Sequence, residues 1–413
     1  MIALDRVPKP INVLYSIDYE VFWTQNDDEV RVLVEPTERL LRQAEELGVR
    51  YTLFVDVLCL FRYRELGLHR FVDAVEEQLR GAVRRGHDVQ THLHPHWLTA
   101  ERKDGRWSFD GESFLLGNFG DADQVYAKTK ELLSRARQYF EALLKPVSPH
   151  YRTVAYRAGG YGLQPNERAI LRALEETGYL IESSVVPGMR RTTGRYRVDF
   201  ASVPARGNWI IGSEGALDRE SASGLLEVPI ASGTIDLLPF LGQIAAYVNR
   251  RISPKQHVLH GSGHSYDADR GRAAQVGSVG ESWSRKVRIL RSRWSRLTIP
   301  VAPLPTLKNL TDNWIKRHAS DGAVAFSMLL HSKGLTQGML DDVRSYTRWI
   351  QSRYGGQVAF LTFLELAWRL EGERDPAEAR ARPAPLTDHY IARDQPESTA
   401  FVRAGRGAPP PSR

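Results

Sequence analysis

Histidines are concentrated in the stretch GHDVQTHLHPHW, residues 86–97, where four of them fall within ten positions. Neutral imidazole nitrogens bind zinc and similar divalent metals, and a catalytic site of this kind adds a carboxylate and keeps one position open for water. His92, His94 and His96 would face one side if a strand continued, whereas a turn at Pro95 would separate His94 from the other two. Local hydrogen bonding can also produce such a run, so the stretch predicts a metal site only together with other ligands.

Two carboxylates are available at the end of the apolar run LYSIDYE, where Asp18 and Glu20 are two residues apart. In a strand, the two-residue period places both side chains on the same face. One acid can then serve as a base while the other binds a metal, and Glu20 with two histidines would complete the expected site. The alternative is that both acids only solvate the end of a strand.

Two further polar side chains follow apolar runs. Arg157 lies in YRAGGYG, where the glycines would allow the backbone to approach a substrate and present its N–H groups. His331 ends the run FSMLLHS, so its side chain would emerge where a strand ends. The alternatives are an ion pair beside a glycine-rich turn for Arg157 and a packed histidine for His331.

Strand-like runs alternate with amphipathic helical patterns along most of the chain, which is typical of a parallel sheet. In α/β barrels the carboxyl ends of the strands carry the active site, so this alternation would bring the polar residues above together. We therefore predict a closed or nearly closed α/β barrel. The expected strands are 11–18, 50–58, 87–92, 153–162, 322–332 and the start of 357–370, and the expected helices include 37–48, 69–86, 122–144 and 336–354.

Composition narrows the class of protein. The only cysteine, Cys59, excludes disulfides within the chain of 413 residues and fits a reducing compartment. The first residues lack a signal-peptide pattern, and no segment offers about 18 uninterrupted apolar residues, so a cytoplasmic protein without a membrane span is expected. The net charge of +7 favours an anionic partner. Nucleic acid is the less favoured one, because no nucleic-acid-binding motif accompanies the charge.

Two regions depart from the alternation. Residues 188–320 are predicted to form an elaborated insertion before the last barrel strands, and residues 373–413, rich in Pro, Arg and Ala, a disordered C-terminal tail. Within the insertion, residues 281–318 mix tryptophan and leucine with many Arg and Lys. This mixture indicates an interfacial helix at the inner membrane face or the rim of an anionic substrate site. The alternative is a solvated helix whose Trp283, Trp294 and Trp314 pack on the barrel.

Taken in order, the motifs SIDYE, GHDVQTHLHPHW, YRAGGYG and MLLHS resemble those of the polysaccharide deacetylase (NodB-homology) family. The segments LIESSVVPG and LLEVPI also resemble connecting segments of these enzymes. The resemblance implies a distorted (β/α)7 barrel. It implies a domain over residues 8–372 that contains the insertion at about 188–320, with the tail 373–413 outside it.

The resemblance also assigns roles around a divalent metal, expected to be zinc. The ligands would be Glu20, His92 and His96, which leaves His94 as an extra histidine. Asp18 would be the general base, and an exchange of roles between Asp18 and Glu20 remains open. Here Leu93 replaces the Ser or Thr that follows the first histidine ligand in the family, and most members carry an adjacent pair of acids in the first motif.

In the family an arginine orients the catalytic acid, and Arg157 matches it. The proline and the aromatic residue that usually follow are replaced by Gly159 and Gly160. The resemblance implies that the oxyanion is stabilised by a backbone N–H near Gly160 or Tyr161.

The histidine of the last family motif matches His331 and would act as general acid, while Met328 and Leu330 would line a pocket for an acyl methyl group. The implied activity is hydrolysis of the acetamido group of an amino sugar, in a surface polysaccharide or a lipid-linked precursor, to acetate and a free amine. Alternatives on the same scaffold are a deformylase or another linear or cyclic amide hydrolase. The alternative from another class is a non-catalytic carbohydrate-binding barrel. The sequence leaves the exact substrate and the oligomeric state open.

Overall fold

The computed structural model describes residues 10–21, 28–109, 113–193, 196–214, 217–252, 293–299, 301–321 and 323–374. The chain divides into two compact units, Met1–Ala367 and Trp368–Arg413. The second unit is described only for the end of helix α11 (Phe363–Arg374). The predicted tail therefore lies almost wholly outside the described residues, and the boundaries 8–372 and 373–413 stay predictions.

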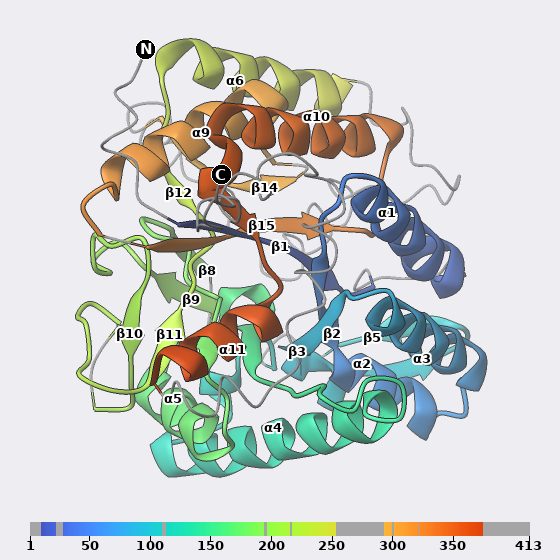
Figure 1. Cartoon of the computed structure of the whole chain (residues 1–413). Helices are drawn as coiled ribbons and strands as arrows, with labels where there is room; N and C mark the ends of the chain where they lie inside the picture. The colour runs from blue at the N-terminus through green and yellow to red at the C-terminus, as the bar shows by residue number, and fades with distance from the viewer. Residues whose placement is uncertain are drawn as a thin grey trace, which may run out of the picture. The chain divides into compact units, whose positions relative to one another are not determined.

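A curled parallel sheet forms the core of the first unit (Figure 1). Its strands carry apolar side chains on both faces, as is usual where helices cover a parallel sheet. The neighbouring strands are, in order, β1 (Ile11–Tyr19), β2 (Tyr51–Asp56), β3 (Asp88–Leu93), β6 (Ala155–Ala158), β7 (Ile181–Glu182), β11 (Leu225–Glu227) and, on the other side of β1, β15 (Val324–His331).

The segment that follows β11 closes this sheet. Ile230 forms a parallel bridge with Ser327 of β15, where Ser327 N donates to Pro229 O (2.9 Å) and Ala231 N donates to Ser327 O (3.3 Å). Seven strands thus surround one interior, and the prediction of a distorted (β/α)7 barrel is confirmed. Shorter strands extend the sheet: β10 (Trp209–Ile211) pairs antiparallel with β11, β14 (Thr298–Ile299) pairs with β15, and β16 (Val358–Phe360) pairs with the start of β1.

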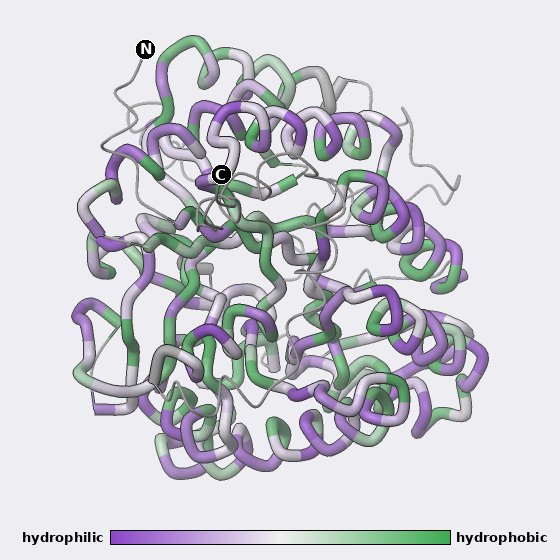
Figure 2. Tube along the Cα trace, viewed as in Figure 1, coloured by the Kyte–Doolittle hydropathy of each residue, from purple (hydrophilic) through white to green (hydrophobic). Residues whose placement is uncertain are grey.

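Amphipathic helices cover the outside of the sheet (Figure 1). In Figure 2 the strands are largely green and the outer helical turns largely purple, as a buried sheet under half-exposed helices requires. Gly48 follows the first of them with a φ of +67°, the left-handed conformation expected of a C-terminal glycine. The helices are α1 (Glu35–Glu46), α2 (Val57–Glu65), α3 (His69–Arg84), α4 (Ala122–Leu144), α5 (Glu167–Glu176), α6 (Leu237–Ile252), α9 (Leu304–Arg317) and α10 (Gln337–Tyr354).

Small hairpins and short helical turns complete the described chain. Two of the turns, η3 (Pro95–Leu98) and η5 (Gly159–Tyr161), directly follow strand ends of the barrel. The hairpins are β4 (Glu101–Lys103) with β5 (Arg106–Ser108) and β8 (Arg190–Thr193) with β9 (Tyr196–Asp199). A separate two-stranded sheet pairs β12 (Ser232–Thr234) antiparallel with β13 (Trp294–Arg296), which follows helix α6 in the chain. The other turns are η2 (Val30–Val34), η4 (Leu116–Asn118) and η6 (Gly355–Gln357).

The range 188–320, predicted as an insertion, contains a strand of the barrel itself. β11 has three residues and lies between Gly224 and Pro229, so it is too short to show a period in the sequence. The hairpin β8–β9, strand β10 and helix α6 are the elaborations around it. Among the described residues, no helix combines the length and the apolar character needed to cross a bilayer.

The tryptophans of residues 281–318 that the structure describes pack against the protein. Trp314 of α9 is buried, and the indole N–H of Trp294 donates to Pro187 O (3.1 Å). Trp283 lies outside the described residues. In the described part of this segment the tryptophans pack on the barrel, which is the alternative to an interfacial helix.

Two glutamates are buried opposite each other on β7 and β11. Glu182 and Glu227 are paired in the register of these strands, and both are fully buried. Burial raises the pKa of both carboxyl groups, and for Glu227 the adjacent Glu182 adds to the effect and takes the pKa well above its ordinary value. The pair is therefore stable in a form that retains a proton.

This pair should make stability depend on pH. A carboxyl group with a raised pKa in the folded state contributes stability that is complete below the unfolded pKa of about 4.3 and is lost as the pH rises through the folded pKa. We expect the Tm of the wild type to fall by about 3 °C or more between about pH 5 and pH 9, and the Glu227→Gln variant to lose most of this decline. Calorimetry across this range measures it. The exposed Glu101→Gln serves as control, and equal slopes in all three proteins would contradict the prediction.

Candidate metal and acid–base site

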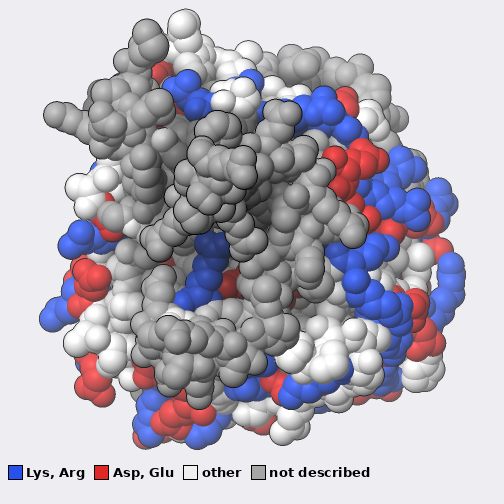
Figure 3. Space-filling model, in the orientation of Figure 1, with Lys and Arg blue, Asp and Glu red and all other residues white. Residues whose placement is uncertain are grey.

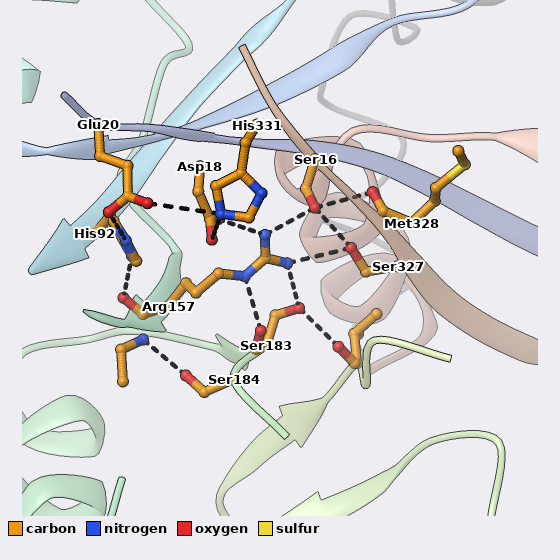
Figure 4. Close-up of polar contacts among 12 residues, drawn as sticks. Ser16, Asp18, Glu20, His92, Arg157, Ser183, Ser184, Ser327, Met328 and His331 are labelled. Carbon is orange, nitrogen blue, oxygen red and sulfur yellow. Dashed lines mark hydrogen bonds and ion pairs between the residues drawn. The ribbon is translucent and has the colours of Figure 1, made fainter. Parts of the chain in front are cut away.

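The polar residues predicted at the strand ends lie together at the carboxyl ends of neighbouring strands. Asp18 is in register with His331 on β15, and His92 on β3 is in register with Arg157 on β6. All four side chains are buried and point toward one another, together with Glu20, which directly follows β1 (Figure 4). The structure therefore brings these predicted residues together at one rim of the barrel, and their chemical roles stay predictions.

Arg157 occupies the centre of this group. Its guanidinium donates to Asp18 Oδ1 (2.9 Å), Ser16 Oγ (2.8 Å), Ser183 O (2.8 Å), Ser183 Oγ (2.9 Å) and Ser327 Oγ (3.2 Å). A charge that is removed from water requires this number of partners. Residues of β1 and β15 and the residue that follows β7 therefore fix the guanidinium position, and with it the orientation of the Asp18 carboxylate.

The charges around Asp18 keep it ionised. Burial alone would raise the pKa of this carboxyl group, but Arg157, and after it His92 and His331, outweigh the burial and hold the pKa below its ordinary value. Asp18 is therefore a carboxylate near neutral pH, the form that can accept a proton.

Glu20 joins two histidines in a group that could hold a metal. The ligand atoms of Glu20, His92 and His94 all lie within 4.8 Å of one another. Glu20 Oε2 contacts His94 Nε2 and is 3.6 Å from His92 Nε2. His92 Nδ1 donates to Arg157 O (2.9 Å), which orients Nε2 toward the group. Within the part of the chain that the structure describes, His92 Nε2 is buried and makes no hydrogen bond. A buried nitrogen without a hydrogen bond is expected where the nitrogen binds a metal.

His96 lies next to this group and not within it. The backbone of His94 is still extended (φ −107°, ψ 97°), and the turn η3 begins only at Pro95. The side chain of His94 therefore lies on the same face as that of His92. The His96 ring contacts those of Trp97, Phe109 and Phe114, and its centroid is 5.1 Å from that of His94. Burial lowers the pKa of His96 well below its ordinary value. The assignment of His96 as a ligand stays a prediction.

A lysine that sequence reasoning missed completes the group. Lys333 is buried, and its Nζ lies 2.9 Å from Glu20 Oε1 and donates to Val21 O (3.3 Å). Burial opposes the charge of Glu20, but Lys333 and His94 hold the pKa of this carboxyl group well below its ordinary value. The only signal in the sequence was the position of Lys333 two residues after His331. A lysine at such a position is also common in an ordinary polar loop, so it did not indicate a site residue.

His331 lies between the two carboxylates. Its Nε2 is 3.7 Å from Asp18 Oδ2 and 3.6 Å from Glu20 Oε1. Burial outweighs the attraction of both acids and lowers the pKa of His331 to about 4. The imidazole is therefore neutral near pH 7 and has to receive a proton before it can act as an acid.

The turn after β6 is shaped by the extra histidine. A Cβ at Gly159 would lie 2.5 Å from Leu93 O and 2.7 Å from His94 Nδ1, so no side chain fits there while His94 keeps its place. Gly160 and Tyr161 follow with φ of +61° and +64°, and Tyr196 donates its hydroxyl hydrogen bond to Gly160 O. The turn adjoins the site, and a role of Gly160 or Tyr161 as oxyanion donor stays a prediction.

The two residues expected to line an acyl pocket are buried in β15. Met328 and Leu330 alternate with Ser327 and His331, whose side chains point into the barrel. Strand alternation therefore places Met328 and Leu330 on the other face, toward the covering helices, and places Leu329 on the face of His331. This placement gives no support to the pocket role of Met328 and Leu330.

Comparisons with known proteins give similarity of structure alone. No family model and no curated protein matches the sequence. The chain is similar to a protein of Mycobacterium smegmatis described as a polysaccharide deacetylase (14% identity, TM-score 0.43, 89% of this chain and 92% of that one). It is also similar to PuuE allantoinase (12%, 0.43, 89% and 92%) and to a protein of Pseudomonas aeruginosa PAO1 described as a polysaccharide deacetylase (13%, 0.42, 89% and 93%). At these scores no activity can be transferred, so a function has to follow from the side chains of this chain.

Proposed function

We propose that this chain is a metal-dependent hydrolase of non-peptide amide bonds, and specifically a carbohydrate N-deacetylase that converts an acetamido group of an amino sugar to acetate and a free amine. The observation that carries the proposal is the buried Asp18–Arg157 ion pair beside the group of Glu20, His92 and His94. An ionised base next to carboxylate and imidazole ligands is the set of groups that metal-assisted amide hydrolysis needs.

The donor atoms fit a divalent metal, for which we propose zinc. Glu20, His92 and a third ligand, either His94 or His96, would hold it, and His92 Nε2 is already oriented by the bond from Nδ1 to Arg157 O. Such an ion supplies Lewis acidity that polarises an amide carbonyl and a water molecule.

The chain's own residues would move the protons. Asp18, aligned by Arg157, would take the proton of the attacking water, and His331, 3.7 Å away, would receive it from Asp18 and pass it to the departing amine. The low pKa of His331 supports this order, because the imidazole starts without the proton it has to deliver. Glu20 is held by histidines and Lys333, whereas Asp18 is held by Arg157, which supports Asp18 as base over the exchanged roles.

Backbone N–H groups of the turn at Gly160 and Tyr161 are our proposal for the stabilisation of the oxyanion. Both residues have a positive φ in a tight turn directly after β6, and a backbone N–H presented there would stabilise the negative charge that develops on the carbonyl oxygen. The pocket for the acyl methyl would be lined by Leu329 in place of Met328 and Leu330, because Leu329 shares the strand face of His331.

Product analysis tests the proposal. The purified protein, loaded with zinc, is incubated with N-acetylated amino sugars, and acetate and free amine are quantified against the Asp18→Asn variant. Equal amounts of acetate and amine from the wild type alone are expected. Release of formate would indicate a deformylase, and a ureido acid from a cyclic ureide would indicate the corresponding amide hydrolase. Sugar binding without any product would leave a carbohydrate-binding barrel.

The location of the substrate is also a proposal. A cytoplasmic enzyme that acts on a lipid-linked sugar precursor at the inner membrane face would agree with the net charge of +7 and with the basic segment 281–318. An assay with the same acetamido sugar in free and in lipid-linked form measures this preference, and equal kcat/KM for both forms would contradict it.

Lys333 should weaken metal binding. Its ammonium group competes with a cation for Glu20 and repels it at short range in a buried site. We expect Lys333→Met to raise the affinity for zinc by about tenfold or more, measured by competition with a chromophoric chelator. The matched control is Lys130→Met, which removes an exposed ion pair with Glu176. Weaker zinc binding in Lys333→Met would mean that the lysine serves mainly to hold Glu20 in position.

A further inference from the structure

Helix α6 (Leu237–Ile252) presents an uncharged apolar face to solvent. Of the five large hydrophobic side chains that are exposed in the described chain, four belong to this helix: Leu237 (55%), Leu238 (79%), Leu241 (51%) and Val248 (47%). The exposed positions are spaced as one helical face, and no charged residue occurs between positions 237 and 249. The face consists of Leu237, Leu238, Leu241, Gly242, Ala245 and Val248.

The opposite side of α6 is fixed to the fold. Phe240 is buried, Gln243 Oε1 accepts a hydrogen bond from Ser295 Oγ (2.8 Å), and Pro239 O accepts one from Thr306 Oγ1 (3.0 Å) of α9. Figure 1 shows α6 as the outermost helix above α9 and α10, and Figure 2 shows the green and white turns along it. The exposed leucines therefore belong to an anchored helix and not to a detached segment.

The size of this face argues against a second copy of the chain as its partner. A helix of 16 residues is about 24 Å long, and one face about 10 Å wide gives on the order of 250 Å². A stable protein interface buries about 800 Å² on each partner. The face is also convex, because it is the outer side of a single helix, so it offers no groove for a peptide.

The charges nearby fit an anionic lipid surface. Lys316 and Arg317 are exposed on α9, which packs against α6. In Figure 3 white atoms lie at the top, where α6 lies in Figure 1, and close below them more Lys and Arg than Asp and Glu atoms are seen. Apolar residues that enter the headgroup boundary, flanked by basic residues that attract anionic headgroups, are the pattern of an interfacial helix.

We propose that α6 is the surface by which this protein binds an anionic membrane, with Leu237, Leu238, Leu241 and Val248 entering the boundary between headgroups and acyl chains. The proposal is independent of the chemistry of the barrel site. It places the contact on a helix that precedes the segment 281–318, whose described tryptophans pack against the protein.

Vesicle sedimentation tests this proposal with the full chain. The vesicles contain phosphatidylcholine with about one third phosphatidylglycerol, and a second set contains phosphatidylcholine alone. We expect wild type to bind the anionic vesicles, and the double variant Leu238→Asp/Leu241→Asp to bind them at least about tenfold more weakly. Leu66→Asp, which changes the one other exposed large hydrophobic residue of the described chain (40%), should bind as wild type does.

Three outcomes would overturn the proposal. Equal binding of wild type and the double variant would place the membrane contact elsewhere. Absence of vesicle binding, together with a wild-type oligomer that dissociates in the double variant on light scattering, would assign the face to a second copy. Absence of vesicle binding in a protein that stays monomeric would mean that other parts of the chain cover the helix. Thermal unfolding of each variant verifies that it is folded.

Discussion

Replacing Asp18 by Asn is expected to lower turnover by about 10²- to 10⁴-fold while the metal content stays near that of the wild type. The amide keeps the size of the side chain and can still meet Arg157, but it cannot accept the proton of the attacking water. The substitution should have this large an effect because Arg157 holds the carboxylate of Asp18 in one orientation. Arg157 is itself held by Ser16, Ser183 and Ser327 as well as by Asp18.

Steady-state kinetics and elemental analysis of the same preparations measure this prediction. Asp88→Asn is the matched control, because Asp88 is also a buried carboxylate of the barrel but lies at the opposite end of β3 from His92. Its turnover per folded molecule should stay close to that of the wild type. If Asp18→Asn lost the metal and Glu20→Gln kept it without turnover, the roles of the two acids would be exchanged.

Replacing His92 by Ala is expected to remove zinc that the wild type binds at about one ion per chain. His92 is the one histidine that both the family resemblance and the geometry assign to the metal, and its Nδ1–H bond to Arg157 O ties its ring to the site. Loss of a direct ligand should exceed the roughly 10- to 100-fold decrease in affinity that changes in supporting residues cause.

His94→Ala and His96→Ala, prepared in parallel, identify the third ligand. The distances predict loss of zinc in His94→Ala, because His94 Nε2 contacts Glu20 Oε2. The family resemblance predicts the reverse. Loss of zinc in His96→Ala alone would mean that the turn η3 moves when the metal binds. Wild type without zinc, even after reconstitution with zinc, nickel or cobalt, would contradict metal-dependent hydrolysis altogether.

The sequence predicts most of the barrel because strand and helix periods are local properties. The runs ending at Asp18, His92, Arg157 and His331 were recognisable as strands, and the rule that strand ends meet at one rim was sufficient to place these side chains together. β11 could not be recognised, because a strand of three residues between a nearby glycine and proline shows no periodicity. Its identity as a barrel strand depends on hydrogen bonds to β7 and β15, which are distant in sequence.

Which of the three histidines lie in the candidate metal group could not be predicted, for a different reason. It depends on where the extended backbone ends, and a proline at position 95 permits a turn either before or after His94. Lys333 was missed because it lies beyond the end of β15, where a lysine is ordinarily solvated, so the rule of strand ends did not include its ion pair with Glu20 or its bond to Val21 O. Such contacts become visible only when the fold is known.

The contact between Gly159 and His94 limits the substitutions that the two positions accept. A residue with a side chain at position 159 and an imidazole at position 94 exclude each other, because they would occupy the same space. Loss of the ring at position 94 alone would leave the contact with the backbone oxygen of Leu93, so a side chain at position 159 also requires a different path of the turn after β6. Glycine at position 159 is therefore a condition for keeping both the present turn and the histidine at position 94.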